Sequence, residues 1–380
     1  MCANVKRKLF IRIQFPKYSQ KFNIQTFHRL VLNREKAFVP QTRNAYLSGQ
    51  RRVKIHRMQI SEYRDYFTQA IAKVAQDKTP NNLYDPIRYI LSLGGKRMRP
   101  VLTLLSADIF GADYKKALQA AIAVEVFHNL SLIHDDIMED APLRRGNETV
   151  HEKWDLNTAI LSGDAMLILA YQYFEHYEPK IFSELAKLFS KTALEVCEGQ
   201  QWDVDFENRD NVTIEEYLKM IEYKTAVLVA AALKMGAIIV ETSEENSKNI
   251  YEFGRNLGIA FQIQDDYLDA FGDPETFGKQ LGGDIIENKK TYLVLKANEF
   301  APDEIKTQLQ HLYSAPSKDN TSKIESVKAI FNQSGASDAA LAAIKEYTLK
   351  AFDTLAQMDI SGQKKEILKE FGQNLMQRKV

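Results

Sequence analysis

The chain has 380 residues, of which 45% are hydrophobic and 26% are charged, a composition that excludes a disordered or collagen-like protein. Two cysteines, Cys2 and Cys197, have no metal-ligand spacing and form no disulfide framework, which favours a reducing compartment. The formal net charge is zero, but residues 58–380 hold 36 Lys and Arg against 49 Asp and Glu, so this acidic part gives little support to nucleic-acid binding.

The first 57 residues differ from the rest, because they carry 14 Lys and Arg against one acid, Glu35. A basic, acid-poor leader resembles an organelle transit peptide, yet this one has few serines and no steady helical period. We expect residues 1–57 to be an extension outside the fold, with targeting or a binding arm as alternatives. Residues 58–380 are expected to form one domain; length alone would allow two, but no Gly-rich or Pro-rich linker divides this part.

Beyond the leader, apolar residues recur every three or four positions, which is the period of an amphipathic helix. The clearest stripes run over residues 122–137 and 253–268. No segment alternates like a strand, and the longest apolar run, residues 227–240, is shorter than the roughly 20 residues that span a bilayer. The sequence therefore predicts an all-α, single-domain protein without stable membrane insertion. The polar stretch 301–322 is expected to be a connection before a peripheral helical part.

Two acidic motifs lie within the apolar stripes. Residues 134–140 read HDDIMED, and Asp135 and Glu139 lie four apart, so they share one face of a helix. Residues 264–269 read QDDYLD, with Asp265 and Asp269 at the same spacing. Carboxylate oxygens suit Mg²⁺, which takes further ligands from water and substrate phosphates. One motif alone could be a solvated acidic face, but two copies in apolar helices indicate opposed metal-binding faces that clamp a diphosphate.

Positive charge that would balance these motifs lies elsewhere in the chain. Residues 94–100 read GGKRMRP, a glycine-opened turn where the backbone can approach an anion and guanidinium groups can grip phosphate oxygens. Each lysine alone is ordinary surface charge, and His128 alone is an ordinary helix histidine, so the inference depends on the whole set. Besides His128, that set is Lys96, Arg97, Arg99, Arg144, Arg145, Lys224, Lys279 and Lys289.

Five segments occur in the order seen in the trans-isoprenyl diphosphate synthase (polyprenyl synthetase) family, which the chain resembles over roughly residues 84–295. They are GGKRMRP, SLIHDDIMEDAPLRRG, EYKTA, FQIQDDYLD and FGKQLGGDIIENKKT. The resemblance implies a helical bundle around a deep central apolar cavity, about three Mg²⁺ ions as cofactors, and a homodimer. With the cysteine content it favours a cytoplasmic location.

The implied reaction joins isopentenyl diphosphate to an allylic diphosphate, namely dimethylallyl, geranyl or farnesyl diphosphate. Departure of the allylic diphosphate leaves a carbocation, the double bond of isopentenyl diphosphate attacks it, and loss of a proton restores an alkene. Water must be excluded, because it would hydrolyse the cation. By the same resemblance, the expected metal ligands are Asp135, Asp136 and Glu139 on one side and Asp265, Asp266 and Asp269 on the other.

The resemblance also implies roles for the remaining polar residues. The expected contacts of the allylic diphosphate are Arg144, Lys224 and Lys279. Those of isopentenyl diphosphate are Lys96, Arg99, His128 and Arg145. Thr225 and Gln262 match positions near the reacting carbons, and Lys289 matches a lysine close to the diphosphate end. The expected catalytic residues are Asp135, Asp136, Lys224 and Asp265.

The first motif departs from the family pattern, which is usually DDxxD. Glu139 stands at the fifth position here, and Asp140 follows it. Glutamate can still bind Mg²⁺, but its extra methylene moves the oxygens. The sequence leaves open whether Glu139 or Asp140 completes the first metal site.

Product length should depend on how far the cavity extends past the first motif. Leu130 lies five residues before Asp135, about 7.5 Å along a helix, and Phe127 lies about 12 Å away. In the family, an aromatic residue five positions upstream tends to give C15 products, and an alanine permits long ones. Leucine is intermediate, so we expect geranylgeranyl diphosphate, with farnesyl diphosphate second. On an ideal helix Leu130 lies about 140° from Asp135, so its place in the cavity rests on the resemblance.

Two other functions share part of this sequence pattern. A class I terpene cyclase would also use Asp135 and Asp136 with Mg²⁺, but it needs neither a second aspartate motif nor a second cationic pocket. A non-catalytic partner subunit of a heteromeric prenyl synthase would be expected to lose acidic motifs, and both are present here.

Overall fold

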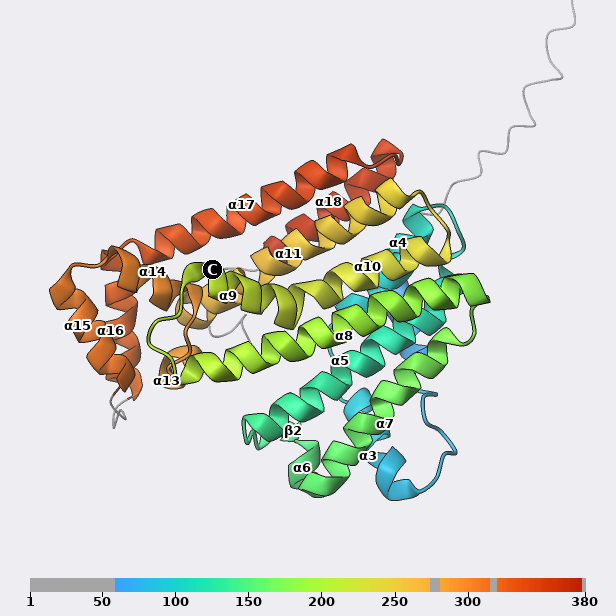
Figure 1. Cartoon of the computed structure of the whole chain (residues 1–380), viewed down its shortest axis with the longest axis horizontal. Helices are drawn as coiled ribbons and strands as arrows, with labels where there is room; N and C mark the ends of the chain where they lie inside the picture. The colour runs from blue at the N-terminus through green and yellow to red at the C-terminus, as the bar shows by residue number, and fades with distance from the viewer. Residues whose placement is uncertain (1–58, 274–280, 315–319, 378–380) are drawn as a thin grey trace, which may run out of the picture. The chain divides into compact units, whose positions relative to one another are not determined.

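The segments with a helical period form helices that pack into a bundle in the computed structural model (Figure 1). The structure describes residues 59–273, 281–314 and 320–377. The elements are α2 (Ile60–Ile71), α3 (Asn81–Ser92), α4 (Met98–Ile109), η1 (Tyr114–Ala117), α5 (Leu118–Met138), β1 (Leu143–Arg144), β2 (Asn147–Glu148), α6 (Val150–Lys153), α7 (Leu156–Phe174), α8 (Pro179–Glu207), α9 (Ile214–Ile221), η2 (Glu222–Ala226), α10 (Val227–Ile239), α11 (Glu244–Phe271), α13 (Gly283–Ile286), α14 (Tyr292–Phe300), α15 (Asp303–Ser314), α16 (Asn320–Gln333), α17 (Ala336–Gln357) and α18 (Gly362–Met376). The all-α prediction is confirmed. Among these helices, none is long and apolar enough to cross a membrane.

Helix α10 is central because its sequence is apolar on all sides. It reads VLVAAALKMGAII, and every residue except Lys234 is buried. A helix of this kind must be covered all round, and α10 packs against α4, α5, α8 and α11. Small residues permit close approach, since a Cβ added at Gly254 of α11 would lie 2.8 Å from Cα of Ala230. Helix α5 carries the first acidic motif and α11 carries the second, and both helices pack against α10.

The C-terminal helices pack on the outer side of the bundle and bury only a minority of their residues. Helix α17, red in Figure 1, lies along α11. The prediction that residues 301–322 form a polar connection is wrong, because α15 occupies Asp303–Ser314. Its Leu309 is buried, with Ile305 and Leu312 packed beside it. The apolar face of α15 is narrow, so the polar residues around it hid the helical period.

A short β-hairpin follows α5. Strands β1 and β2 pair antiparallel, with Leu143 opposite Glu148 and Arg144 opposite Asn147. The two turn residues, Arg145 and Gly146, have φ of 54° and 75°, which is the backbone of a type I′ turn. This hairpin carries the adjacent arginines that the sequence singled out.

Candidate active site

A cavity of about 1070 Å³ opens between α4, α5, α8, α10 and α11. A volume of this size suits a ligand of about the size of a drug molecule. Apolar side chains form much of the wall, and they come from four helices. They include Phe127, Leu130, Val196, Leu228, Phe261 and Leu268.

Helix α5 brings the first acidic motif to this cavity. Asp135 and Glu139 both line the wall, as expected for residues four apart on one helical face. Asp136 lies behind them and is fully buried. Its Oδ1 accepts hydrogen bonds from Arg144, with Nε at 2.6 Å, whereas its Oδ2 has no hydrogen-bond partner among the described residues. The motif therefore has two carboxylates facing the cavity and one that holds an arginine.

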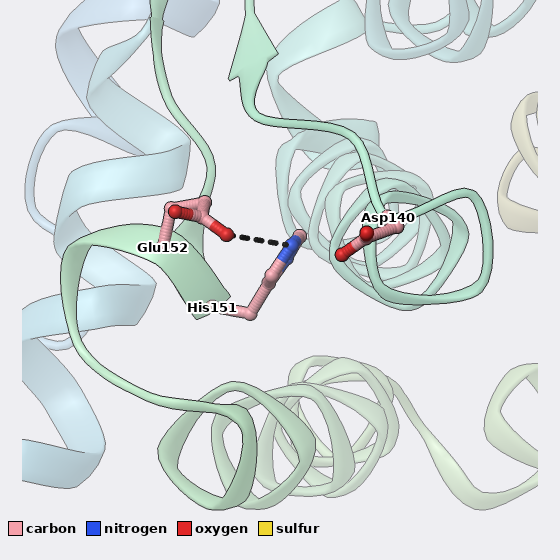
Figure 2. Close-up of side chains that lie close together, drawn as sticks. All are labelled: Asp140, His151 and Glu152. Atoms are coloured by element: carbon pink, nitrogen blue, oxygen red, sulfur yellow. Dashed lines mark ion pairs between the residues drawn. The ribbon is translucent and has the colours of Figure 1, made fainter.

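The end of α5 separates Glu139 from Asp140. Asp140 adopts the left-handed conformation at φ 49°, and the amides of Asp140 and Ala141 donate to carbonyls of the last turn at 3.3 and 2.9 Å. This is a Schellman cap, whose turn sends the next residue off the helix face. Asp140 does not line the cavity, and its side chain lies beside His151 (Figure 2). Glu139 remains in the wall, with its Oε1 3.9 Å from Nζ of Lys289.

Helix α11 carries the second motif in the same manner. Asp265 lines the cavity, while Asp266 and Asp269 are buried. Asp266 accepts a hydrogen bond from the hydroxyl of Tyr217 at 2.5 Å and another from Nε2 of Gln262 at 3.2 Å. These donors fix the carboxylate that stands directly behind the cavity wall.

Burial disfavours the charged form of several of these carboxylates. It raises the pKa of Asp135 to about 6, although nearby Lys224 opposes the shift. It also raises the pKa of Asp266, and it raises that of Asp284 further with the help of Asp266 and Asp269. Buried carboxylates at this density favour protonation unless a cation neutralises them. Since all the donors are oxygens, the set fits a hard divalent ion such as Mg²⁺.

Two acids near the site were not singled out by the sequence reasoning. The amide of Asp284 donates to Oδ2 of Asp269 at 3.1 Å, so its carboxylate lies next to the second motif. Asp203 of α8 accepts a hydrogen bond from Nζ of Lys224 at 2.6 Å. The glycine pair before Asp284 was a usable signal, because it marks a tight turn. Asp203 has no motif around it that would distinguish it.

Cations gather where the turn before α4 meets the β-hairpin. Lys96, Arg99, His128 and Arg145 all line the cavity. Nη1 of Arg99 lies 3.2 Å from Nε2 of His128, and Arg145 donates to the carbonyl oxygen of Gly94. Burial, reinforced by Arg99, lowers the pKa of His128 well below its ordinary value, so the imidazole is neutral. Three positive side chains and one neutral imidazole therefore converge here.

The glycine-opened turn holds this cluster by close packing. Gly95 has φ 121°, and a Cβ there would lie 2.9 Å from the guanidinium of Arg145. Arg97, which the sequence grouped with the phosphate-gripping cations, is instead buried, and its Nη1 lies 2.6 Å from Oε1 of buried Glu125. A glycine is required at position 95 so that Arg145 can lie flat against the turn.

A π-helical turn, η2, presents Lys224 and Thr225 to the cavity. Such turns insert one residue into a helix and often occur at functional sites. Thr225 donates from Oγ1 to Oε1 of Gln262 at 3.2 Å, which links η2 to α11. Gly199 of α8 lets this turn approach, because a Cβ there would lie 2.7 Å from the carbonyl carbon of Tyr223.

The predicted residues thus divide into three groups. Lys279 lies outside the described residues. Asp136, Asp266 and Asp269 stand behind the cavity wall. The residues that line the cavity are Lys96, Arg99, Phe127, His128, Leu130, Asp135, Glu139, Arg144, Arg145, Lys224, Thr225, Gln262, Asp265 and Lys289.

Known proteins with similar sequences come from one family. A family model described as Polyprenyl synthetase matches residues 80–333. The chain is 41% identical over 262 residues to a geranylfarnesyl diphosphate synthase of Natronomonas pharaonis, covering 63% of this chain and 76% of that protein. It is 43% identical over 232 residues to a geranylgeranyl diphosphate synthase of Methanosarcina mazei, covering 60% and 72%.

Solved structures agree with the sequence comparison. A crystal structure of a geranylgeranyl pyrophosphate synthase superposes with a TM-score of 0.82 at 53% identity, and covers 85% of this chain and 100% of that one. The geranylgeranyl pyrophosphate synthetase of Pyrococcus horikoshii superposes with a TM-score of 0.79 at 35% identity, covering 84% and 97%.

Proposed function

Because this chain belongs to the polyprenyl synthetase family, we propose that it is a trans-prenyltransferase that condenses isopentenyl diphosphate with an allylic diphosphate and yields mainly geranylgeranyl diphosphate. The observation that carries this proposal is the cavity itself. Carboxylates from α5 and α11 face it, a cationic cluster lies beside them, and apolar side chains line its depth. In a prenyl diphosphate, the diphosphate would lie among the charged side chains and the prenyl tail along the apolar ones.

We assign the metal-binding faces to Asp135 and Glu139 of α5 and to Asp265 of α11, with Asp136, Asp266 and Asp269 in support. When bound, Mg²⁺ would neutralise the allylic diphosphate and make it a better leaving group. Glu139 is preferred to Asp140 as the fifth position of the first motif, because Glu139 lines the cavity and Asp140 does not. The number of ions, about three in our proposal, follows the family resemblance.

The leaving diphosphate is assigned to Arg144, Lys224 and Lys279, with Lys289 close to it. Arg144 is held by Asp136 and Lys224 by Asp203, each at 2.6 Å, so both cations are oriented before substrate arrives. Their charge stabilises the negative charge that develops as the C–O bond breaks. Isopentenyl diphosphate is assigned to Lys96, Arg99, His128 and Arg145, which bind it without metal.

The carbocation forms at the level of Thr225 and Gln262. The hydroxyl of Thr225 donates to Oε1 of Gln262, which fixes the two polar groups relative to each other. We assign the reacting carbons to the space beside them. The electrons of the isopentenyl double bond form the new C–C bond and leave a positive charge on the other carbon of that double bond. A proton then leaves a neighbouring carbon, and its C–H electrons form the new double bond. The departed diphosphate is the proposed acceptor of that proton. Apolar walls formed by Leu228, Phe261 and Leu268 keep water from the cation.

We further propose a homodimer. We call the following exposed apolar side chains of α7, with one of α8, which packs against it, the apolar row. Such a row on a folded surface is typical of a protein interface. The row consists of Leu156, Ile160, Leu161, Ile168 and Leu194.

The cytoplasm is the proposed location, on the basis of cysteine content. Residues 1–57 are proposed to be dispensable for catalysis, so that a chain beginning at Met58 should keep the turnover of the full chain. A loss of turnover with intact folding would show that the leader takes part in catalysis.

The purified chain tests the function directly. It is incubated with Mg²⁺, isopentenyl diphosphate and, separately, dimethylallyl, geranyl and farnesyl diphosphate, and the products are identified by chain length. We expect geranylgeranyl diphosphate from each primer. If folded protein gives no product with any primer, the chain is a partner subunit instead. A cyclic hydrocarbon from geranyl or farnesyl diphosphate alone would indicate a terpene cyclase.

A further inference from the structure

Outside the cavity, three metal-ligating side chains converge at the base of the β-hairpin. Asp140 ends the turn after α5, and His151 and Glu152 come from α6. One ligand atom from each lies within 4.8 Å of the others, and Figure 2 shows the three side chains pointing toward one another. None of the three lines the cavity, and this includes Asp140, the residue that the sequence offered as the alternative to Glu139.

The histidine makes this more than an acidic surface cluster. The His151 side chain is only 9% exposed, yet neither ring nitrogen has a hydrogen-bond partner in the described part of the chain. Its Nε2 lies 3.8 Å from Oε1 of Glu152, a separation that is too long for a hydrogen bond. A buried imidazole without a hydrogen bond is costly, and an ion bound to one ring nitrogen would remove that cost.

From this geometry we propose that Asp140, His151 and Glu152 bind a divalent first-row transition ion such as Zn²⁺, at a site separate from the Mg²⁺ sites. One imidazole nitrogen and two carboxylate oxygens suit Zn²⁺ better than Mg²⁺, which prefers oxygen alone. Nitrogen and oxygen ligands around one tetrahedral Zn²⁺ lie about 3.3–3.6 Å apart. Asp140 and Glu152 are exposed, so their carboxylates can rotate inward to close the present gap.

Such an ion would fasten the hairpin at both of its ends. Asp140 precedes β1 and His151 follows β2, while Arg144 and Arg145 lie between them. The backbone already closes there, since the amide of Thr149 donates to the carbonyl of Pro142 at 3.1 Å. The ion would add a second link, and it would thereby restrict the segment that presents both arginines to the cavity.

The test uses the full chain, stripped of metal and labelled with ¹⁵N-histidine. Zn²⁺ is titrated in a large excess of Mg²⁺, which occupies the oxygen-only sites, and binding is followed by calorimetry and by the ring ¹⁵N shifts. We expect one Zn²⁺ per chain, a large shift at a His151 nitrogen, and a higher thermal unfolding midpoint. His151→Gln should weaken binding at least about tenfold, because it removes the one nitrogen ligand.

Asp140→Asn and Glu152→Gln keep the test decisive if His151→Gln fails to fold, because both positions are exposed. Each should weaken Zn²⁺ binding, whereas the matched controls Glu148→Gln and His176→Gln should leave it unchanged. Unmoved His151 nitrogens on addition of Zn²⁺ would overturn the site. Wild-type affinity in His151→Gln, together with reduced activity, would also overturn it and would make His151 a positioning residue for the neighbouring motif.

Discussion

Adjacent aspartates of the first motif have different surroundings. Asp135 faces the cavity, and Asp136 is buried against Arg144. Removing Asp136 would therefore leave Arg144 without its orienting partner as well as removing a carboxylate from the motif. The same division holds on α11, where Asp265 faces the cavity and Tyr217 holds Asp266. In each motif, therefore, one aspartate faces the cavity, and the next aspartate in the sequence lies behind the cavity wall and binds a neighbouring side chain.

Stability at mildly acidic pH should depend on His128. Its folded pKa is depressed below the unfolded value of about 6.5, so the unfolded state binds more protons below that pH. Stability is therefore lost as pH falls from about 6.5 toward the folded pKa, by up to about 1.4 kcal/mol per pH unit. Urea unfolding at pH 7.5 and 5.5 measures this loss.

The variant His128→Gln isolates that effect, because glutamine does not titrate. We expect a smaller difference between the two pH values in His128→Gln than in the wild type, and an unchanged difference in the control His176→Gln. An equal pH dependence in the wild type and His128→Gln would contradict a neutral, buried imidazole.

Product length should depend on the side chains beneath the first motif. Phe127 and Leu130 line the cavity, and the Phe127 ring packs edge-on against Phe189 at 5.1 Å between centroids. Phe127→Ala and Leu130→Ala should therefore extend the cavity and shift products from C20 toward C25 or longer. Chromatography of the products checks this, with the volume-conserving Leu130→Met as control. Unchanged C20 products from both alanine variants would place the chain-length limit elsewhere.

Among the elements, the π-helical turn η2 depends on close packing against α8. A Cβ at Gly199 would lie 2.7 Å from the carbonyl carbon of Tyr223 and 2.8 Å from Cα of Lys224. Gly199→Ala should force the turn outward, destabilise the protein by about 1–3 kcal/mol, and lower kcat because Lys224 moves. Denaturant unfolding and turnover measure both effects.

Gly362→Ala is the matched control, because that glycine begins α18 with no heavy atom within 4 Å of an added Cβ. It should keep wild-type turnover and gain a few tenths of a kcal/mol or more in stability. Wild-type stability and turnover in Gly199→Ala would contradict the tight packing of η2 on α8.

Element by element, the sequence predicted long helices well and their ends poorly. The stripes over residues 122–137 and 253–268 lie on α5 and α11, because an apolar period sustained over several turns has few other solutions. The spacing of Asp135 and Glu139 also predicted their common place in the cavity wall. The Schellman turn at Asp140 left no such signal, since aspartate fits many turns. Asp203 reaches the site only through tertiary packing, whereas the glycine pair before Asp284 gave at least the signal of a tight turn.

The ideal-wheel estimate for Leu130 shows a related limit. An angle of about 140° from Asp135 suggested that the two residues face different surroundings. Both line the cavity, however, because it follows a wide arc of α5 from Phe127 to Glu139. A wheel gives directions around one helix, but the extent of a cavity depends on how far the neighbouring helices stand away from it.

For the whole molecule, the exposed apolar row on α7 predicts self-association. Leu161 and Ile168 are each 60% exposed, although Leu and Ile favour burial. Light scattering after size exclusion should give twice the chain mass for the wild type. Leu161→Glu with Ile168→Glu should give a monomer, because two charges in an apolar interface are unfavourable. The control Leu341→Glu changes an exposed leucine of α17 and should remain a dimer. A monomeric wild type would exclude this interface.

In our proposal, one cavity binds two diphosphates, one through metal ions and one through cationic side chains. Steady-state kinetics of Arg99→Gln and Asp265→Asn can distinguish the two sites. We predict that Arg99→Gln raises the KM for isopentenyl diphosphate at least about tenfold, because a charged hydrogen-bond donor is lost, while the KM for the allylic diphosphate changes less than about twofold. Asp265→Asn should instead lower kcat at least about 100-fold, because stabilisation of the leaving group is lost. Equal rises of both KM values in Arg99→Gln, or wild-type kcat in Asp265→Asn, would contradict two separate diphosphate sites.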